Sequence, residues 1–228
     1  MIFISEIGLN YNANFLNCEK LIQKSKWAGA DIAKFQLGWK GKKDEINHLD
    51  YERVSQLFKW GEKYEIEIMF SIFNKEALEM IKKFPVKRFK IASRTLLDEP
   101  SLCEEIISLN KETFVSLGMW QDKTNLPYQN KNIKYLWCKS SYPTSDEELK
   151  LLPKSFLNKE IVGYSDHSIG IESALIAITR GAQVIEKHFT LDKKSNFIRD
   201  HSLSAEPDDF KQLTILGKEI SKKVNLGI

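Results

Sequence analysis

The fold is decided by residues 160–189, which read EIVGYSDHSIGIESALIAITRGAQVIEKHF. An apolar, strand-like run at 160–165 is followed by a helical stretch at 170–180 and by a second strand-like run at 183–189. Strand, helix and strand in this order are the repeating unit of a parallel sheet covered by helices. Each run ends beside a histidine, His167 in the first and His188 in the second. The stretch therefore predicts two neighbouring strands whose carboxyl ends bring two imidazoles together.

The same alternation continues over the whole chain of 228 residues. The predicted strands are 2–7, 31–36, 66–72, 87–92, 113–117, 133–138, 160–165 and 183–189. The predicted helices are 17–28, 51–64, 74–83, 99–109, 145–151, 170–180 and 207–223, and the polar segment 119–131 is left unassigned. Eight strands of this kind predict an α/β fold, an eight-stranded parallel (β/α)8 TIM barrel. A doubly wound open sheet is the alternative, but no glycine-rich dinucleotide fingerprint follows the first strand.

Composition and charge indicate one globular domain at residues 1–228, since no linker or shift in composition divides the chain. The net charge of +3 comes from well-mixed basic and acidic residues and argues against a nucleic-acid partner. The three cysteines, Cys18, Cys103 and Cys138, fit neither a zinc site nor a disulfide framework. No signal-peptide pattern and no membrane-length run of about 20 apolar residues are present, so a cytoplasmic protein without a membrane partner is expected.

A barrel predicts that functional groups lie at the carboxyl ends of its strands. Polar residues do collect at these ends: Glu6, Asn10, Lys34, Gln36, Ser71, Lys90, Ser93, Ser140, Ser141, Tyr142, Ser165, Asp166, His167, Glu186 and His188. A polar group near almost every strand end indicates one shared site.

Two lysines, Lys34 and Lys90, lie in predicted strands whose flanking residues are apolar. Because strand residues alternate between faces, the apolar neighbours would pack on helices and the lysines would point into the barrel. A buried ammonium group needs a partner. One interpretation is a bound phosphate or carboxylate, and the other is an internal ion pair with Glu6 or Glu186. Glu6 is itself predicted to point inward, as an ion-pair partner or an acid–base group.

The two strand-end histidines, His167 and His188, allow two interpretations. As a pair they suit a metal with open coordination positions, because imidazole binds Zn, Fe, Cu and Ni, and binds Mn when oxygen ligands join it. As single residues they would be hydrogen-bonded structural histidines. Asp200 and His201 follow the last strand, and either could line the same site.

Several of these segments resemble the N-acetylneuraminate (sialic acid) synthase family. They are ISEIGLN at 4–10, GADIAKFQ at 29–36, FKIAS at 89–93, SYPT at 141–144, SDHSIG at 165–170, GAQVIEKHFTL at 181–191, and Asp200-His201 followed by Ser204. The resemblance covers almost the whole chain in the right order. It implies a barrel enzyme that condenses phosphoenolpyruvate with an N-acetylated aldose to give a nonulosonic acid and phosphate. It also implies a divalent metal, usually Mn and with Mg or Co as alternatives, on His167 and His188.

The resemblance further assigns roles by position. The residues that would hold the phosphate and carboxylate of phosphoenolpyruvate are Lys34, Lys90, Ser71, Ser93 and Ser165. Those that would contact the sugar are Glu6, beside the metal-bound water, with Tyr142 and Asp200, and Asn10 joins the substrate-binding group.

The chain departs from the family pattern in the half that would bind the sugar. Tyr11 stands where histidine is usual, Ala13 where glycine is common, and Arg94-Thr95 where glycine and an acidic residue follow the FKIAS motif. The loop after the second strand is short, and the resemblance ends with the barrel, so a protein without the family's antifreeze-like domain is expected. Arg94 or Arg199 would then replace the arginine that this domain supplies across the family dimer.

These departures keep other functions and assemblies open. One alternative is another metal-dependent barrel enzyme acting on a phosphorylated small molecule. Another is a non-catalytic binding homologue that needs a partner. The resemblance implies a homodimer, and a separate antifreeze-like protein is the alternative partner.

Overall fold

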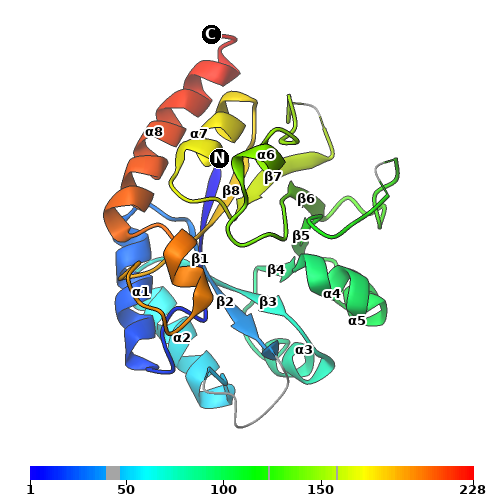
Figure 1. Cartoon of the computed structure of the whole chain (residues 1–228). Helices are drawn as coiled ribbons and strands as arrows, with labels where there is room; N and C mark the ends of the chain where they lie inside the picture. The colour runs from blue at the N-terminus through cyan, green and yellow to red at the C-terminus, as the bar shows by residue number, and fades with distance from the viewer. Residues whose placement is uncertain (40–46, 123, 158) are drawn as a thin grey trace.

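Eight parallel strands close into a barrel in the computed structural model of the chain, with helices around it (Figure 1). The structure describes residues 1–39, 47–122, 124–157 and 159–228. The strands are β1 (Ile2–Gly8), β2 (Ile32–Leu37), β3 (Glu67–Ile72), β4 (Arg88–Ile91), β5 (Glu112–Ser116), β6 (Ile133–Trp137), β7 (Ile161–Asp166) and β8 (Val184–His188). The helices are α1 (Leu16–Trp27), α2 (Tyr51–Lys63), α3 (Lys75–Ile81), α4 (Ser93–Asp98), α5 (Pro100–Ser108), α6 (Asp146–Leu149), α7 (Glu172–Thr179), the 3-10 helix η2 (Arg199–Leu203) and α8 (Pro207–Asn225).

The barrel closes because β1 pairs with β2 on one side and with β8 on the other, both in parallel. The predicted TIM barrel is thus confirmed, and the bounds of all eight predicted strands agree with the structure to within one residue. A doubly wound sheet would have left β1 and β8 unpaired with each other.

The predicted helix at 99–109 corresponds to α5, and the structure has an additional short helix, α4, directly before it that the sequence did not indicate. Glu99, with a φ of −132° and a ψ of 58°, separates α4 from α5, which begins at Pro100. A residue before proline is pushed out of the helical region, whereas proline itself is tolerated in the first turn. Helix α4 begins with Ser93 and Arg94, directly after the carboxyl end of β4.

The barrel interior has an apolar layer and, above it, a polar one. The apolar layer consists of Ile4, Ile32, Met69, Phe114, Leu136 and Val184. Two positions further along the same six strands lie Glu6, Lys34, Ser71, Ser116, Cys138 and Glu186, which all line one cavity. Residues two apart share a strand face, so the polar residues face the barrel interior because the apolar residues do. The barrel is therefore packed with apolar side chains at one end and open to polar chemistry at its carboxyl end.

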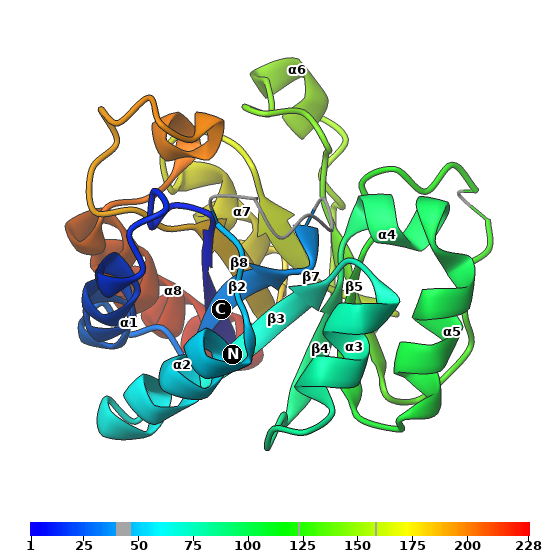
Figure 2. The ribbon, with the colours of Figure 1, turned by 90° about the horizontal axis from the view of Figure 1, so that it is seen from below.

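The helices cover the outside of the barrel in two groups, with α1 and α8 on one side and α3, α4 and α5 on the opposite side (Figures 1 and 2). Helix α8 packs on α7 and α1 and so covers the seam where β1 meets β8. It approaches closely at Gly217, where an added Cβ would lie 2.7 Å from the Phe3 ring.

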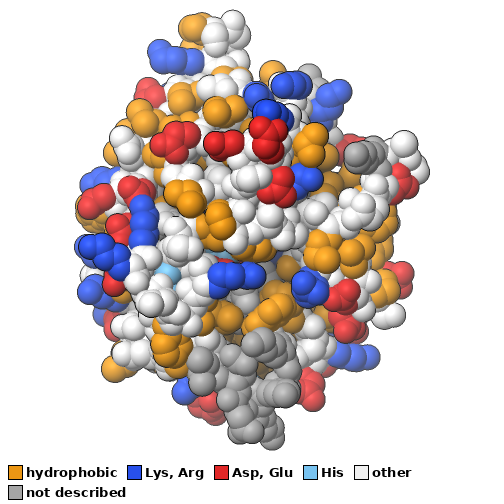
Figure 3. Space-filling model, viewed as in Figure 1, with side chains coloured by type: hydrophobic (Ala, Val, Ile, Leu, Met, Phe, Trp, Pro, Cys, Tyr) orange, Lys and Arg blue, Asp and Glu red, His pale blue; other side chains and the backbone are white. Residues whose placement is uncertain are grey.

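The molecular surface mixes charges, as the composition predicts. Acidic and basic side chains are interspersed on the face drawn in Figure 3. Within the described residues, no helix is long and apolar enough to cross a membrane.

Candidate active site

A cavity of about 700 Å³ opens at the carboxyl ends of the strands. Its lining includes ten of the eleven predicted site residues: Glu6, Lys34, Ser71, Lys90, Ser93, Tyr142, Ser165, His167, His188 and Asp200. These residues come from β1, β2, β3, β4, β7, β8, η2 and the loops that follow the strands. The strand ends thus bring these predicted residues together around one cavity.

The floor of the cavity carries four charged side chains in a chain of ion pairs. Lys34 Nζ lies 2.6 Å from Glu6 Oε2 and 3.6 Å from Glu186 Oε2. Lys90 Nζ lies 3.6 Å from the other Glu186 oxygen. Both lysines therefore point inward as predicted, and the ion pairs proposed as the alternative are present too. The two interpretations are compatible, because an anionic ligand can compete with Glu186 for both ammonium groups.

Burial sets the protonation of this floor. It raises the pKa of Glu6 despite the nearby Lys34. Burial would also raise the pKa of Glu186, but Lys34 and Lys90 together hold it down, at about 2. Burial lowers the pKa of Lys90. Glu186 is thus the fixed anion of the floor, and Glu6 holds a proton more readily than Glu186 does.

Hydroxyl groups complete the floor. Lys34 donates to Ser71 Oγ at 2.9 Å and Lys90 donates to Ser116 Oγ at 2.8 Å. Ser165 donates to Glu186 at 2.7 Å. Ser93 is held differently, because its oxygen accepts the Gly118 N–H and its hydroxyl donates to the Ser116 carbonyl. The serines hold the charged groups in place and surround them with polar contacts.

The two histidines lie side by side at the ends of β7 and β8, with ring centroids 5.4 Å apart. Nδ1 of His167 donates to the Lys139 carbonyl, which leaves the Nε2 lone pair available. Burial lowers the pKa of His167 to about 4 and also lowers that of His188. His188 Nδ1 is buried, has no hydrogen-bond partner among the described residues and lies 3.9 Å from Asp200 Oδ2.

This arrangement fits an open metal site. The described residues contain no group of three or more His, Cys, Asp or Glu side chains placed to hold a metal. They do offer two adjacent imidazoles that burial keeps neutral, as metal ligands must be. The backbone bond to Nδ1 of His167 is the support that a metal-binding histidine commonly has. With only two protein donors, water and substrate oxygens would supply the remaining positions.

The mouth of the cavity is formed by aromatic and charged groups. Tyr142 stacks on His167 at 4.2 Å between centroids, and the Arg199 guanidinium lies 4.6 Å from the centre of the Tyr142 ring. Burial raises the pKa of Tyr142, so its hydroxyl stays protonated and can donate a hydrogen bond. Arg94 also lines the cavity, 3.8 Å from Asp98.

Asn10 is the one predicted site residue outside the cavity lining. Its amide donates to the Phe189 carbonyl and the Ser204 hydroxyl, both at 3.0 Å. It ties the segment after β1 to the segments after β8. Strand-end position indicated a polar role for Asn10 but could not distinguish a ligand contact from a loop tether.

The departure at Tyr11 also has a structural use. Its ring is buried and its hydroxyl donates to the Asn47 carbonyl. The Ala13 N–H donates to the Asn47 side chain at 3.0 Å, with Ala13 at a φ of +59°. These contacts hold the segment after β1 against the described end of the connection between β2 and α2.

Sequence reasoning missed several lining residues. They include Ser116, Cys138, Trp39, Phe73, Met119 and Ile198. Ser116 and Cys138 could have been found, because each lies two positions after an inward apolar residue. The residues of the mouth come from loops, and no periodic pattern indicates them.

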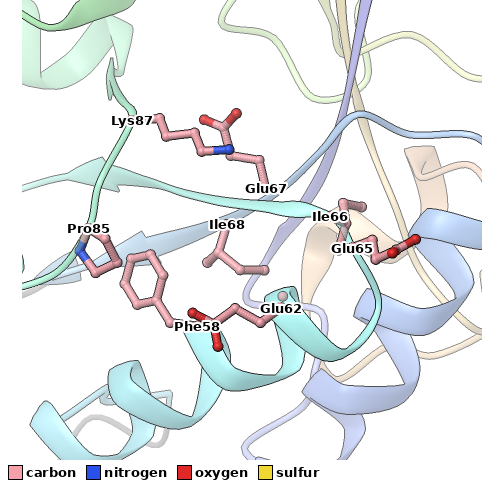
Figure 4. A pocket seen from close by; sticks show the side chains of 9 residues that line it. Phe58, Glu62, Glu65, Ile66, Glu67, Ile68, Pro85 and Lys87 are labelled. Atoms are coloured by element: carbon pink, nitrogen blue, oxygen red, sulfur yellow. The ribbon is translucent and has the colours of Figure 1, made fainter.

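A second cavity, of about 460 Å³, lies near the amino-terminal ends of β3 and β4. Phe58 of α2 and Ile68 of β3 face each other across it, with Pro85, Lys87 and Glu67 around them (Figure 4). None of the predicted site residues lines it. The second cavity therefore shares no residue with the predicted site at the carboxyl end of the barrel.

Comparisons with known proteins show which family the chain resembles in sequence and in fold. The sequence model of the NeuB family matches residues 41–227. The chain is 32% identical to the N,N'-diacetyllegionaminic acid synthase of Campylobacter jejuni, covering 100% of this chain and 78% of that protein. It is 34% identical to the uncharacterized protein MJ1065 of Methanocaldococcus jannaschii, covering 98% of this chain and 72% of that protein. The crystal structure of N-acetylneuraminic acid synthetase from Leptospira borgpetersenii superposes with a TM-score of 0.85 at 26% identity, covering 98% and 84%.

Proposed function

The chain belongs to the NeuB family, and we propose that it condenses phosphoenolpyruvate with an N-acetylated aldose to form a nonulosonic acid and phosphate. The observation that carries the proposal is the pair of buried lysines, Lys34 and Lys90, on the floor of the cavity. Burying two ammonium groups beside one cavity is costly unless anions meet them. Phosphoenolpyruvate offers both a phosphate and a carboxylate.

In the proposed reaction the lysines hold the phosphate and carboxylate of phosphoenolpyruvate, with Ser71, Ser93 and Ser165 around them. Carbon 3 forms a bond to the aldehyde carbon of the sugar as the double bond between carbons 2 and 3 opens, which leaves a cation at carbon 2. The aldehyde oxygen takes up a proton to become a hydroxyl group. Water then adds to carbon 2, and phosphate leaves with its bridging oxygen, so that a ketone remains.

Glu6 serves as the proton-transfer group. Its raised pKa makes it a stronger base than an exposed carboxylate, so it can accept a proton from the water that adds to carbon 2. Tyr142 and Asp200, at the mouth of the cavity, contact the acceptor sugar. A divalent metal on His167 and His188, Mn²⁺ with Mg²⁺ or Co²⁺ as alternatives, would polarise the aldehyde as a Lewis acid.

The test is phosphate release by the Mn-loaded protein with phosphoenolpyruvate and a panel of N-acetylated and plain aldoses. We expect release that needs both phosphoenolpyruvate and a sugar. Release without phosphoenolpyruvate, from another phosphorylated substrate, would indicate a different barrel enzyme. Binding of phosphoenolpyruvate with no release for any sugar would favour a non-catalytic homologue or an enzyme that needs a partner.

A further inference from the structure

We infer that the buried ion pair between Asp166 and Lys187 is a positioning device that fixes the two cavity histidines relative to each other. The inference rests on the proposed function, in which His167 and His188 together bind the metal. Asp166 and Lys187 directly precede these histidines on β7 and β8. Because alternate strand residues face opposite sides, the ion pair lies outside the barrel and the histidines lie at the cavity.

The pair joins the two strands at the same level. Asp166 and Lys187 are directly opposite each other in the parallel ladder of β7 and β8. Lys187 Nζ lies 3.1 Å from Asp166 Oδ2, and neither side chain has any exposed surface. A buried pair without access to water holds its geometry more tightly than a surface pair, because no solvent competes for its hydrogen bonds.

Asp166 also shapes the turn that carries His167. Its Oδ1 accepts the backbone N–H of Ser168 at 2.7 Å, which closes an Asx turn with His167 at its centre. The hydroxyls of Ser168 and Tyr164 donate to the same oxygen, and Ser173 donates to Oδ2 at 3.1 Å. The Asp166 carboxylate thus binds residues that come before and after His167 in the sequence.

Lys187 connects this turn to β8. Besides Asp166, its ammonium group donates to the carbonyl oxygen of Ser168. One side chain on β8 therefore binds both ends of the turn around His167, and the next residue on β8 is His188. A shift of one histidine relative to the other would break contacts at both ends of the turn.

The pair has no other evident task. It does not line the cavity, so it meets no substrate. A buried salt bridge is also weak evidence for stability, since an apolar pair of similar volume often stabilises as well. The contacts of Asp166 and Lys187 converge on the segment between the two histidines, which is what a positioning role requires.

The test variant is Asp166→Asn combined with Lys187→Met, which removes both charges and leaves neither unpaired. The control is Glu67→Gln combined with Arg88→Met, an ion pair of 2.9 Å near the amino-terminal end of the barrel. The first readout is the set of imidazole NMR signals in the metal-free protein, which has only four histidines. The second readout is a Co²⁺ titration, and the third is phosphoenolpyruvate affinity without metal.

We expect the signals of His167 and His188 to move in the test variant while that of His48 stays in place. Co²⁺ affinity falls about 10- to 100-fold, the range for lost support of metal ligands, and phosphoenolpyruvate affinity is retained. The control variant keeps the imidazole signals and Co²⁺ affinity of the wild type.

A folded test variant with unchanged imidazole signals and Co²⁺ affinity would overturn the inference. If the double variant does not fold, Ser173→Ala removes one hydrogen bond from Asp166, and unchanged signals of both histidines in that variant would overturn it as well. A wild-type protein that binds no Co²⁺ would refute the metal in the proposed function, while the imidazole signals still decide the positioning role.

Discussion

Glu6, Lys34, Glu186 and Lys90 share the cavity floor, and each is paired because an isolated buried charge is too costly. Glu186 contacts both lysines, so it occupies the place that an anionic substrate would take. In the proposed function, binding of phosphoenolpyruvate would loosen these pairs. The floor would then act as a preassembled anion site that its own carboxylate neutralises until a ligand arrives.

At this scale, Lys90→Met is expected to weaken phosphoenolpyruvate binding about 10- to 100-fold, since a hydrogen bond to a charged group contributes about 1.5–3 kcal/mol. Glu186 keeps Lys34 as a partner, so the variant should fold. The measurements are the phosphoenolpyruvate affinity and the KM for the sugar. Lys87→Met, beside the second cavity, is the control. Equal weakening for both substrates would argue against the assigned role.

His188→Ala is expected to reduce metal-dependent turnover at least about 100-fold, because a single remaining imidazole holds the metal poorly and Lewis-acid catalysis contributes several kcal/mol. Circular dichroism should show a retained fold. His48→Ala, whose imidazole lies outside the cavity lining, should keep full activity. Full activity of His188→Ala would remove this residue from the ligand set.

At the scale of the elements, Gly163 of β7 lies tightly against Val184 of β8. An added Cβ there would lie 2.2 Å from the Val184 carbonyl oxygen, closer than any real contact. Glycine therefore allows β7 to pair in register with β8, which places Asp166 opposite Lys187. The close packing of β7 on β8 thus determines how His167 and His188 are placed at the ends of these strands.

Gly163→Ala is expected to lower the free energy of unfolding by about 1–3 kcal/mol, the usual cost of overpacking a core. Urea unfolding followed by circular dichroism measures the change. Gly227→Ala is the comparison, since an added Cβ at that glycine meets nothing within 4 Å. A Gly163→Ala protein as stable as the wild type would mean that β7 can move away from β8 without loss.

For the molecule as a whole, closure of the barrel buries titratable groups that would be exposed in the unfolded chain. His167 changes most clearly, since burial lowers its pKa from 6.5 to about 4. Between these values the unfolded chain takes up a proton that the folded protein does not. The contribution of His167 to stability is therefore complete above pH 6.5 and is lost as the pH falls toward 4.

The free energy of unfolding that His167 loses over this pH range is about 3 kcal/mol. The raised pKa of Glu6 acts in the opposite direction, because the folded protein then binds its proton more tightly than the unfolded chain. Comparing wild type with His167→Asn, both with chelator, isolates the histidine. We expect the stability advantage of the wild type to shrink between pH 7 and pH 4.5 in urea unfolding. A constant difference over this range would contradict the lowered pKa.

The sequence by itself determined the barrel, the bounds of its strands and the inward direction of Lys34 and Lys90. These features depend on alternation and on helix periodicity, which are local properties of the chain. The same alternation would have indicated Ser116 and Cys138, because each lies two positions after an inward-facing residue, Phe114 or Leu136.

Only the tertiary structure decided which side chains meet. It paired Lys34 with two carboxylates, removed Asn10 from the cavity lining, and brought Tyr142 and Arg199 together at the mouth. It also joined Asp166 and Lys187 outside the barrel, although 20 residues separate them along the chain. Such contacts depend on the register and closure of eight strands, because each strand sets only the face of its own residues and the barrel sets which faces come within reach of one another.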